Sequence, residues 1–170
     1  MRCLSEQEIR QWMAQRLPPG TPLDATGVPD LHAIGYEAAS CSFPGDSGQK
    51  VCLARLAAVF FASETNVLVC VRNWMVFPSS GHPPLLLRLR QALGEHRPLE
   101  DCPGHLFSAQ EADDALSVII LALEFFWDCS VLGESGRVAL FVSHDEYVEF
   151  FSTDRSLTAR FKNAVGTASK

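Results

Sequence analysis

The sequence has no apolar segment long enough to cross a membrane and no excess of positive charge. Its most apolar run, residues 116–127, contains Glu124 and spans only twelve positions, whereas a transmembrane helix needs about 20. Lys and Arg number 14 against 20 Asp and Glu, which gives a formal net charge of −6. Binding to a phosphate backbone requires clustered Lys and Arg. We therefore expect neither membrane insertion nor nucleic-acid binding.

The sequence also lacks the marks of a secreted, disulfide-bonded protein. Residues 1–16 carry charge every few positions and contain no apolar core of a secretory signal. None of the six cysteines forms a CxxC pair, and thiols stay reduced in the cytoplasm. We therefore expect a cytoplasmic protein whose cysteines are free.

Motifs of well-known enzymes are missing. GxSxG, HExxH, GxGxxG and the phosphate loop GxxxxGK[ST] do not occur. The string GDSG at 45–48 matches the serine motif of chymotrypsin-like proteases, but only 46 residues precede Ser47, too few for the barrel that carries the rest of a triad. A turn in which Asp46 or Ser47 caps the following helix is the simpler interpretation. No catalytic residue and no cofactor is predicted.

Metal-binding spacing is almost absent as well. Cys102 and His105 are two possible zinc ligands close together in the sequence. A structural zinc site needs four ligands, and no second matched pair is present. A loop with a turn at Pro103 and Gly104 is the better interpretation.

What the sequence does contain predicts an α+β fold. With 170 residues, of which 47% are apolar and 20% charged, the chain can form a single domain over 1–170 with its own core. We expect a mixed sheet of four to five strands packed with helices. The loop at about 17–30, with four prolines and two glycines, is expected to be irregular. Hydrophobic periodicity places helices at 5–16, 50–62, 83–93 and 108–127, and strands at 32–43, 66–77, 128–132 and 137–142.

Two of these segments carry particular expectations. The helix at about 108–127 is apolar almost all round, so we expect it at the centre of the core. The segment 50–62 is predicted as a helix, but a strand remains the alternative, because periodicity alone does not decide a short apolar run.

The stretch FVSHDEY at 141–147 has two interpretations. Ser143 followed by Glu146 matches the capping box S-x-x-E, as do Ser5 with Glu8 and Ser108 with Glu111. A strand that ends in a helix is therefore predicted here, and the chain then ends in helical material. Alternatively, His144 is a base or metal ligand beside Asp145, assisted by Asp128 or His105.

One further residue is a candidate for binding. Trp74, near the end of a predicted strand, is either part of the core, which is the default for such a residue, or an exposed aromatic anchor for a partner protein.

Several short strings together resemble a group of uncharacterised small bacterial proteins. These are an N-terminal helix of the type LSEQEIRQW, then GHLF at 104–107, FFWD at 125–128, a hairpin, and SHDEY at 143–147. The resemblance implies a bacterial cytoplasmic protein. The group has no assigned activity, so the resemblance implies no catalytic residue.

The sequence favours a non-enzymatic protein that binds a protein partner, of the immunity or accessory type. Its acidic charge, its small size and the lack of a catalytic motif point this way. The rival hypothesis is a small enzyme or metal-binding domain with a site around His144 and Asp145, together with Asp128 and His105.

Overall fold

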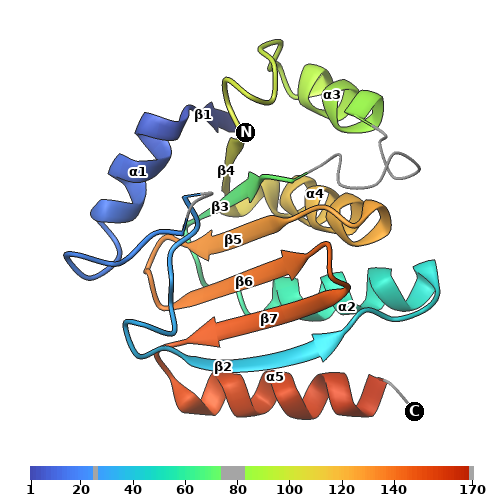
Figure 1. The fold of residues 1–170 in the computed structure, drawn as a ribbon. Helices are drawn as coiled ribbons and strands as arrows, with labels where there is room; N and C mark the ends of the chain where they lie inside the picture. The colour runs from blue at the N-terminus through green and yellow to red at the C-terminus, as the bar shows by residue number, and fades with distance from the viewer. Residues whose placement is uncertain (25–26, 74–82, 169–170) are drawn as a thin grey trace.

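The computed structural model of this chain describes residues 1–24, 27–73 and 83–168. These residues form one seven-stranded sheet and five α-helices (Figure 1), so the α+β prediction is confirmed. The strands are β1 (Arg2–Leu4), β2 (Glu37–Ser42), β3 (Asn66–Val71), β4 (Gly104–Ser108), β5 (Cys129–Gly133), β6 (Val138–Ser143) and β7 (Tyr147–Ser152). The helices are α1 (Glu6–Ala14), α2 (Ser47–Val59), α3 (Pro83–Ala92), α4 (Ala112–Phe125) and α5 (Arg155–Ala168).

The sheet differs from the predicted one in size and direction. The strands lie in the order β1-β4-β3-β5-β6-β7-β2, and every neighbouring pair is antiparallel. The prediction of four to five strands in a mixed sheet is therefore wrong. It missed β1, which is only three residues long, β4, which begins at the glycine of a Pro-Gly pair, and β7, which was expected to be helical.

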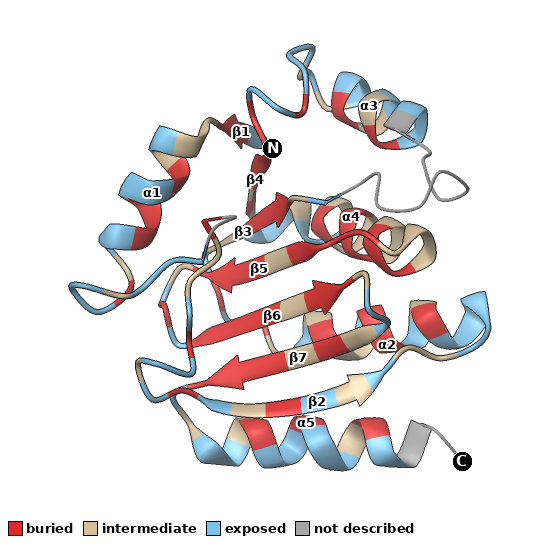
Figure 2. Ribbon diagram, viewed as in Figure 1, coloured by how far each residue is buried: buried red, intermediate tan, exposed pale blue. Residues whose placement is uncertain are grey.

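Three helices cover one face of the sheet. Residues of α2, α4 and α5 pack with strand residues in the larger of two apolar clusters, in which Trp127, Phe150 and Phe161 are fully buried. In Figure 2 the sheet-facing sides of these helices are buried and their outer sides are exposed or intermediate. The alternative of a strand at 50–62 is excluded, because α2 forms there, capped by Asp46, whose side chain accepts from the Gln49 N–H at 2.9 Å.

The most apolar helix is not at the centre of the core. It begins at Ala112, after a 3₁₀ turn at Ala109–Glu111, and ends at Phe125. Its buried residues lie on one stripe, at Ala115, Val118, Ile119, Ala122 and Leu123, which is the pattern of a helix covering a surface. The expected central helix over 108–127 is thus corrected to an outer-layer helix. Its apolar outer residues, which are partly exposed, misled the prediction.

The opposite face of the sheet is only partly covered. Helix α1 has the predicted capping box, in which Ser5 and Glu8 bind each other's backbone N–H groups, and it buries Ile9, Trp12 and Met13. The segment after it crosses the sheet; among its described residues it has no helix, only an isolated bridge between Leu23 and Pro29. The open part of this face lies beside that segment. No helix within the described residues has the length and apolar character needed to span a membrane.

Candidate functional site

The stretch FVSHDEY forms a hairpin turn between β6 and β7. Residues 144–146 make a three-residue loop, in which Glu146 has φ +65° and its N–H donates to the Ser143 carbonyl at 3.1 Å. The Ser143 hydroxyl accepts from the Asp145 N–H at 3.2 Å. A three-residue loop that ends in a left-handed residue is a common hairpin connection. The predicted capping box at Ser143 and Glu146 is therefore wrong.

The turn is held by a buried carboxylate. Asp128, just before β5, has a side chain that is 9% exposed. Its Oδ1 accepts from the backbone N–H of His144 at 2.8 Å and lies 2.8 Å from the His144 ring Nδ1. The Asn73 amide donates to its Oδ2. Because a carboxylate can only accept hydrogen bonds, Nδ1 of His144 carries a proton and donates a hydrogen bond to Asp128. Nε2 is the ring nitrogen that does not contact Asp128.

The electrostatics of this pair favour a charged imidazole. The pKa of His144 is raised, first by its hydrogen bond to Asp128 and then by the charges of Asp128 and Asp145. Nε2 lies 3.6 Å from Oδ1 of Asp145, whose side chain is 72% exposed. Among the described residues, no Ser, Cys or Lys side chain is hydrogen-bonded to His144, so the pair lacks the adjacent nucleophile that a histidine base activates.

His105 does not join this group. It lies on β4, opposite Val69 of β3 and Cys3 of β1, and is completely buried. Its Nδ1 is 3.2 Å from the Val69 carbonyl oxygen. Burial, followed by the nearby Arg90 charge, lowers the pKa of His105 to about 4. Three of the four residues in the predicted cluster therefore meet, and His105 has a separate position in the core.

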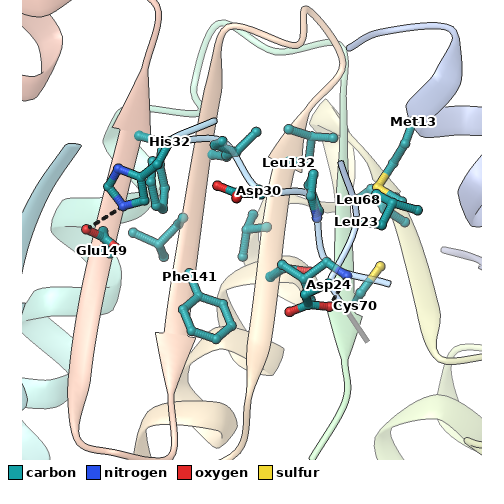
Figure 3. A pocket seen from close by; sticks show the side chains of 18 of the residues that line it. Met13, Leu23, Asp24, Asp30, His32, Leu68, Cys70, Leu132, Phe141 and Glu149 are labelled. Atoms are coloured by element: carbon teal, nitrogen blue, oxygen red, sulfur yellow. Dashed lines mark hydrogen bonds and ion pairs between the residues drawn. The ribbon is translucent and has the colours of Figure 1, made fainter. Parts of the chain in front are cut away.

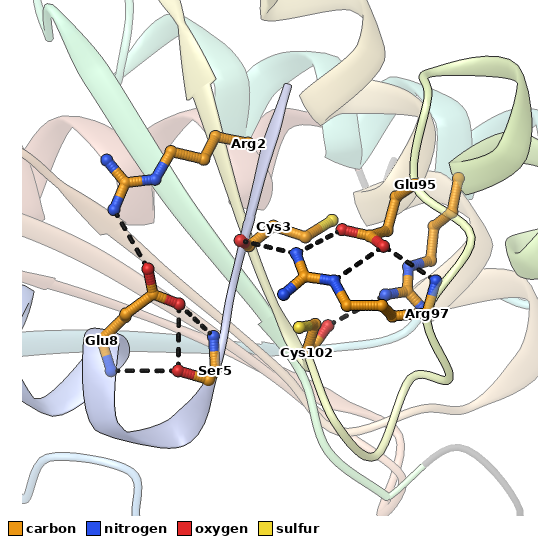
Figure 4. A network of polar contacts seen from close by, with 8 residues as sticks. Arg2, Cys3, Ser5, Glu8, Glu95, Arg97 and Cys102 are labelled. Atoms are coloured by element: carbon orange, nitrogen blue, oxygen red, sulfur yellow. Dashed lines mark hydrogen bonds and ion pairs between the residues drawn. The ribbon is translucent and has the colours of Figure 1, made fainter.

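Polar groups around β1 and β4 form a structural network (Figure 4). The Arg97 side chain donates two hydrogen bonds of 2.6 and 2.9 Å to the Glu95 carboxylate and one of 3.4 Å to the Cys3 carbonyl, and the Arg97 backbone N–H also donates to Glu95 at 2.8 Å. The buried Arg90 donates to the Cys102 carbonyl at 3.2 Å. Within the described ranges, no three His, Cys, Asp or Glu side chains are placed to hold a metal ion. Trp74 lies outside the described residues.

A cavity of about 320 Å³ lies on the open face of the sheet. Its floor is made by alternate residues of four strands, including Leu68, Leu132, Ala139, Phe141 and Phe151. This follows from the two-residue period of a strand, which sends every second side chain to the same face. Figure 3 shows Leu68, Leu132 and Phe141 of the floor together with the chain segment that carries Leu23, Asp24, Asp30 and His32, and Met13 of α1 lies at one end.

The cavity is lined by three carboxylates and one histidine. Its carboxylates are Asp24, Asp30 and Glu149, and it includes no Lys or Arg among the described residues. His32, with a side chain 60% exposed, has its Nε2 at 3.3 Å from Oε1 of Glu149. The arrangement suits an apolar occupant that carries positive charge, because opposite charges attract more strongly beside a poorly solvated wall.

The prediction from sequence did not find this cavity. Its lining comes from α1, from the loop at about 17–30 and its continuation, and from β3, β5, β6 and β7. One signal was present: β3 and β6 carry apolar residues at consecutive positions, as in residues 67–71 and 138–142, which is typical of strands that are covered on both faces.

The comparisons with known proteins give no match: none of the known family models fits the chain, and no curated protein or solved structure is significantly similar to it.

The Asp128–His144 pair predicts a specific pH dependence of stability. Because the pKa of His144 is raised in the folded protein, its contribution is complete below the unfolded value of about 6.5 and is lost as the pH rises through the folded value. In urea unfolding between pH 5.5 and 9, the difference in free energy of unfolding between the wild type and His144→Gln should decrease as the pH rises. His105, whose pKa is lowered by burial, adds the same opposite trend to both proteins. His96→Gln, at an exposed histidine, is the control and should behave as wild type. Identical slopes in His144→Gln and the wild type would contradict the assignment.

Proposed function

We propose that this chain is a non-enzymatic protein that binds a protein partner through the cavity on the open face of its sheet, as an immunity-type or accessory factor. The observation that carries the proposal is the cavity itself, apolar at its floor and bordered by carboxylates. Its volume of about 320 Å³ lies within the range of binding sites, roughly 300–1,000 Å³. Leu23, 38% exposed at the edge, is available for contact with a partner.

A second candidate is a small enzyme or metal-binding domain around His144 and Asp145. Its support is the Asp128–His144 hydrogen bond, which orients the imidazole as a base would require. The same bond also has a structural explanation, since Asp128 fixes the backbone of the turn through the His144 N–H. The cavity therefore supports the binding proposal more directly than the histidine supports catalysis.

The proposal is tested by narrowing the cavity. Ala139, buried at its floor, is changed to Leu, and exposed Ala159 of α5 is changed to Leu as the matched control. Tagged wild type at low salt should retain a partner from a lysate of the source organism, identified by mass spectrometry. Ala139→Leu should weaken retention by at least about tenfold, because added atoms in a packed site cause steric clash. Ala159→Leu should retain the partner fully.

Two further variants keep this test decisive. Leu23→Asp alters the partly exposed edge without a change in the core, so it replaces Ala139→Leu if urea unfolding shows that the latter does not fold. His144→Gln separates the two candidates. Retention that is lost in His144→Gln and unchanged in the cavity variants would contradict binding through the cavity and favour a role for the histidine.

A further inference from the structure

We infer that the occupant of the cavity is a short cationic segment of the partner protein, in which one aliphatic or aromatic side chain fills the apolar floor and neighbouring Lys or Arg side chains face Asp30 and Glu149. This inference rests on the proposed function and adds the chemistry of the partner to it.

The shape of the cavity argues for a side-chain anchor. The floor residues Leu68, Leu132, Ala139 and Phe151 are all buried, and they face the cavity from neighbouring strands. A large apolar side chain gains most free energy when it is inserted into such a site, and interface anchors are mainly aromatic residues and Arg.

The chain itself supplies an example of the proposed contact. His32 lies with its ring 5.0 Å from that of Phe151, edge to face, while its Nε2 is 3.3 Å from Oε1 of Glu149. An aromatic group that can carry positive charge therefore lies against Phe151 of the cavity floor and pairs with the Glu149 carboxylate. A Lys or Arg of a partner is charged at all pH values near neutrality and is the stronger counterpart for Glu149.

Charge also decides between possible occupants. The lining has three carboxylates and, among the described residues, no Lys or Arg, and the whole chain has a formal charge of −6. A second copy of this chain would bring the same negative charge to the same negative surface, which opposes association. A basic segment is complementary on both counts.

Synthetic peptides test the inference directly. The probes are short fluorescent peptides with one central Trp and flanking Lys residues, matched peptides with Glu in place of Lys, and matched peptides with Ser in place of Trp. Binding to the full chain is measured by fluorescence polarisation. The Lys-flanked Trp peptide should bind, and both matched peptides should bind at least about tenfold more weakly. Added salt should weaken binding of the Lys-flanked peptide, because exposed charges are screened.

Matched variants locate the effect. Glu149→Gln and Asp30→Asn should each reduce the preference for Lys over Glu flanks, while Glu100→Gln, which removes one charge from an exposed position outside the cavity, should leave it unchanged. Ala139→Leu should weaken all peptides that contain Trp.

The outcomes separate this inference from the proposal on which it rests. Trp peptides that bind without regard to flanking charge, or that prefer Glu, would overturn the inference and leave binding through the cavity intact. Failure of every peptide, with a partner still lost from Ala139→Leu, would also overturn the inference alone. If the peptides fail and the cavity variants retain every partner, both ideas are wrong.

Discussion

Asp128→Ala should lower the free energy of unfolding by about 3 kcal/mol, because removal of one partner from a buried, charge-assisted set of hydrogen bonds leaves the others unsatisfied. The Asp128 side chain is 9% exposed and accepts from the His144 backbone, the His144 ring and the Asn73 amide. The change removes the side-chain link between the start of β5 and the β6–β7 turn, while the backbone hydrogen bonds of Asp128 with Arg72 and Asn73 remain. Urea unfolding at pH 6, where the His144 ring is charged, measures the loss of stability.

The neighbouring carboxylate provides the control for Asp128. Asp145→Ala removes an acid that also faces His144, but its side chain is 72% exposed, so the change in stability should stay within about 0.5 kcal/mol. Asp128→Asn should fall between the two, since it keeps an acceptor for the His144 N–H but not the charge. Equal effects of Asp128→Ala and Asp145→Ala would show that the carboxylate at 128 does not fix the turn.

The contact between Asp128 and His144 was within reach of the sequence. Once the GESG hairpin is predicted, its register opposes Cys129 to Val142, which brings Asp128 level with Ser143 and next to His144. Local signals of this kind, together with the caps at Ser5 and Asp46, depend on residues close in sequence. The caps at Ser5 and Asp46 were correctly predicted for that reason.

The strand β7 shows why other parts were not predicted. S-x-x-E at 143–146 suits a helix start, but the same Ser hydroxyl also binds the Asp145 N–H in a hairpin turn. The choice is made by β6 on one side of β7 and by β2 on the other. Since β2 lies more than a hundred residues earlier in the sequence, no local sequence pattern predicts that it pairs with β7.

The cavity depends even more on distant contacts. Its floor comes from four strands, and its wall comes from the loop at about 17–30 and the residues after it. Proline and glycine predict an irregular loop there, but they do not indicate which surface it crosses. The path of this loop over the sheet is fixed at its two ends. Arg16 at the start and Tyr36 at the end both contact the β5–β6 turn.

The turn that receives these contacts contains a glycine with little space around it. Gly136 has φ +66°, and a Cβ added there would lie 2.2 Å from the carbonyl oxygen of Arg16. The Tyr36 hydroxyl donates to the Gly136 carbonyl, and Arg16 pairs with Glu134 of the same turn at 2.7 Å. One turn therefore positions the start and the end of the cavity wall.

Gly136→Ala should consequently be one of the most damaging single-methyl changes in this chain. A left-handed conformation costs a non-glycine residue about 1–2 kcal/mol, and relief of the clash requires movement of the Arg16 backbone, so we expect a total loss of about 3 kcal/mol. Gly20→Ala is the matched control: it has φ +80° in the loop at about 17–30, but an added Cβ there meets nothing within 4 Å. Gly20→Ala should therefore lower the free energy of unfolding only by the cost of the left-handed conformation, about 1 kcal/mol. Urea unfolding compares the two.

The same pair of variants also links the turn to binding. If the wall is held at Gly136, then Gly136→Ala should bind the Lys-flanked Trp peptide more weakly than Gly20→Ala does, under conditions where both proteins remain folded. This follows because the clash moves Arg16 and Tyr36, which bracket the segment carrying Leu23 and Asp30. Equal stability and equal binding in the two variants would mean that the wall is held elsewhere, and that the close approach of Arg16 to Gly136 has no influence on the cavity.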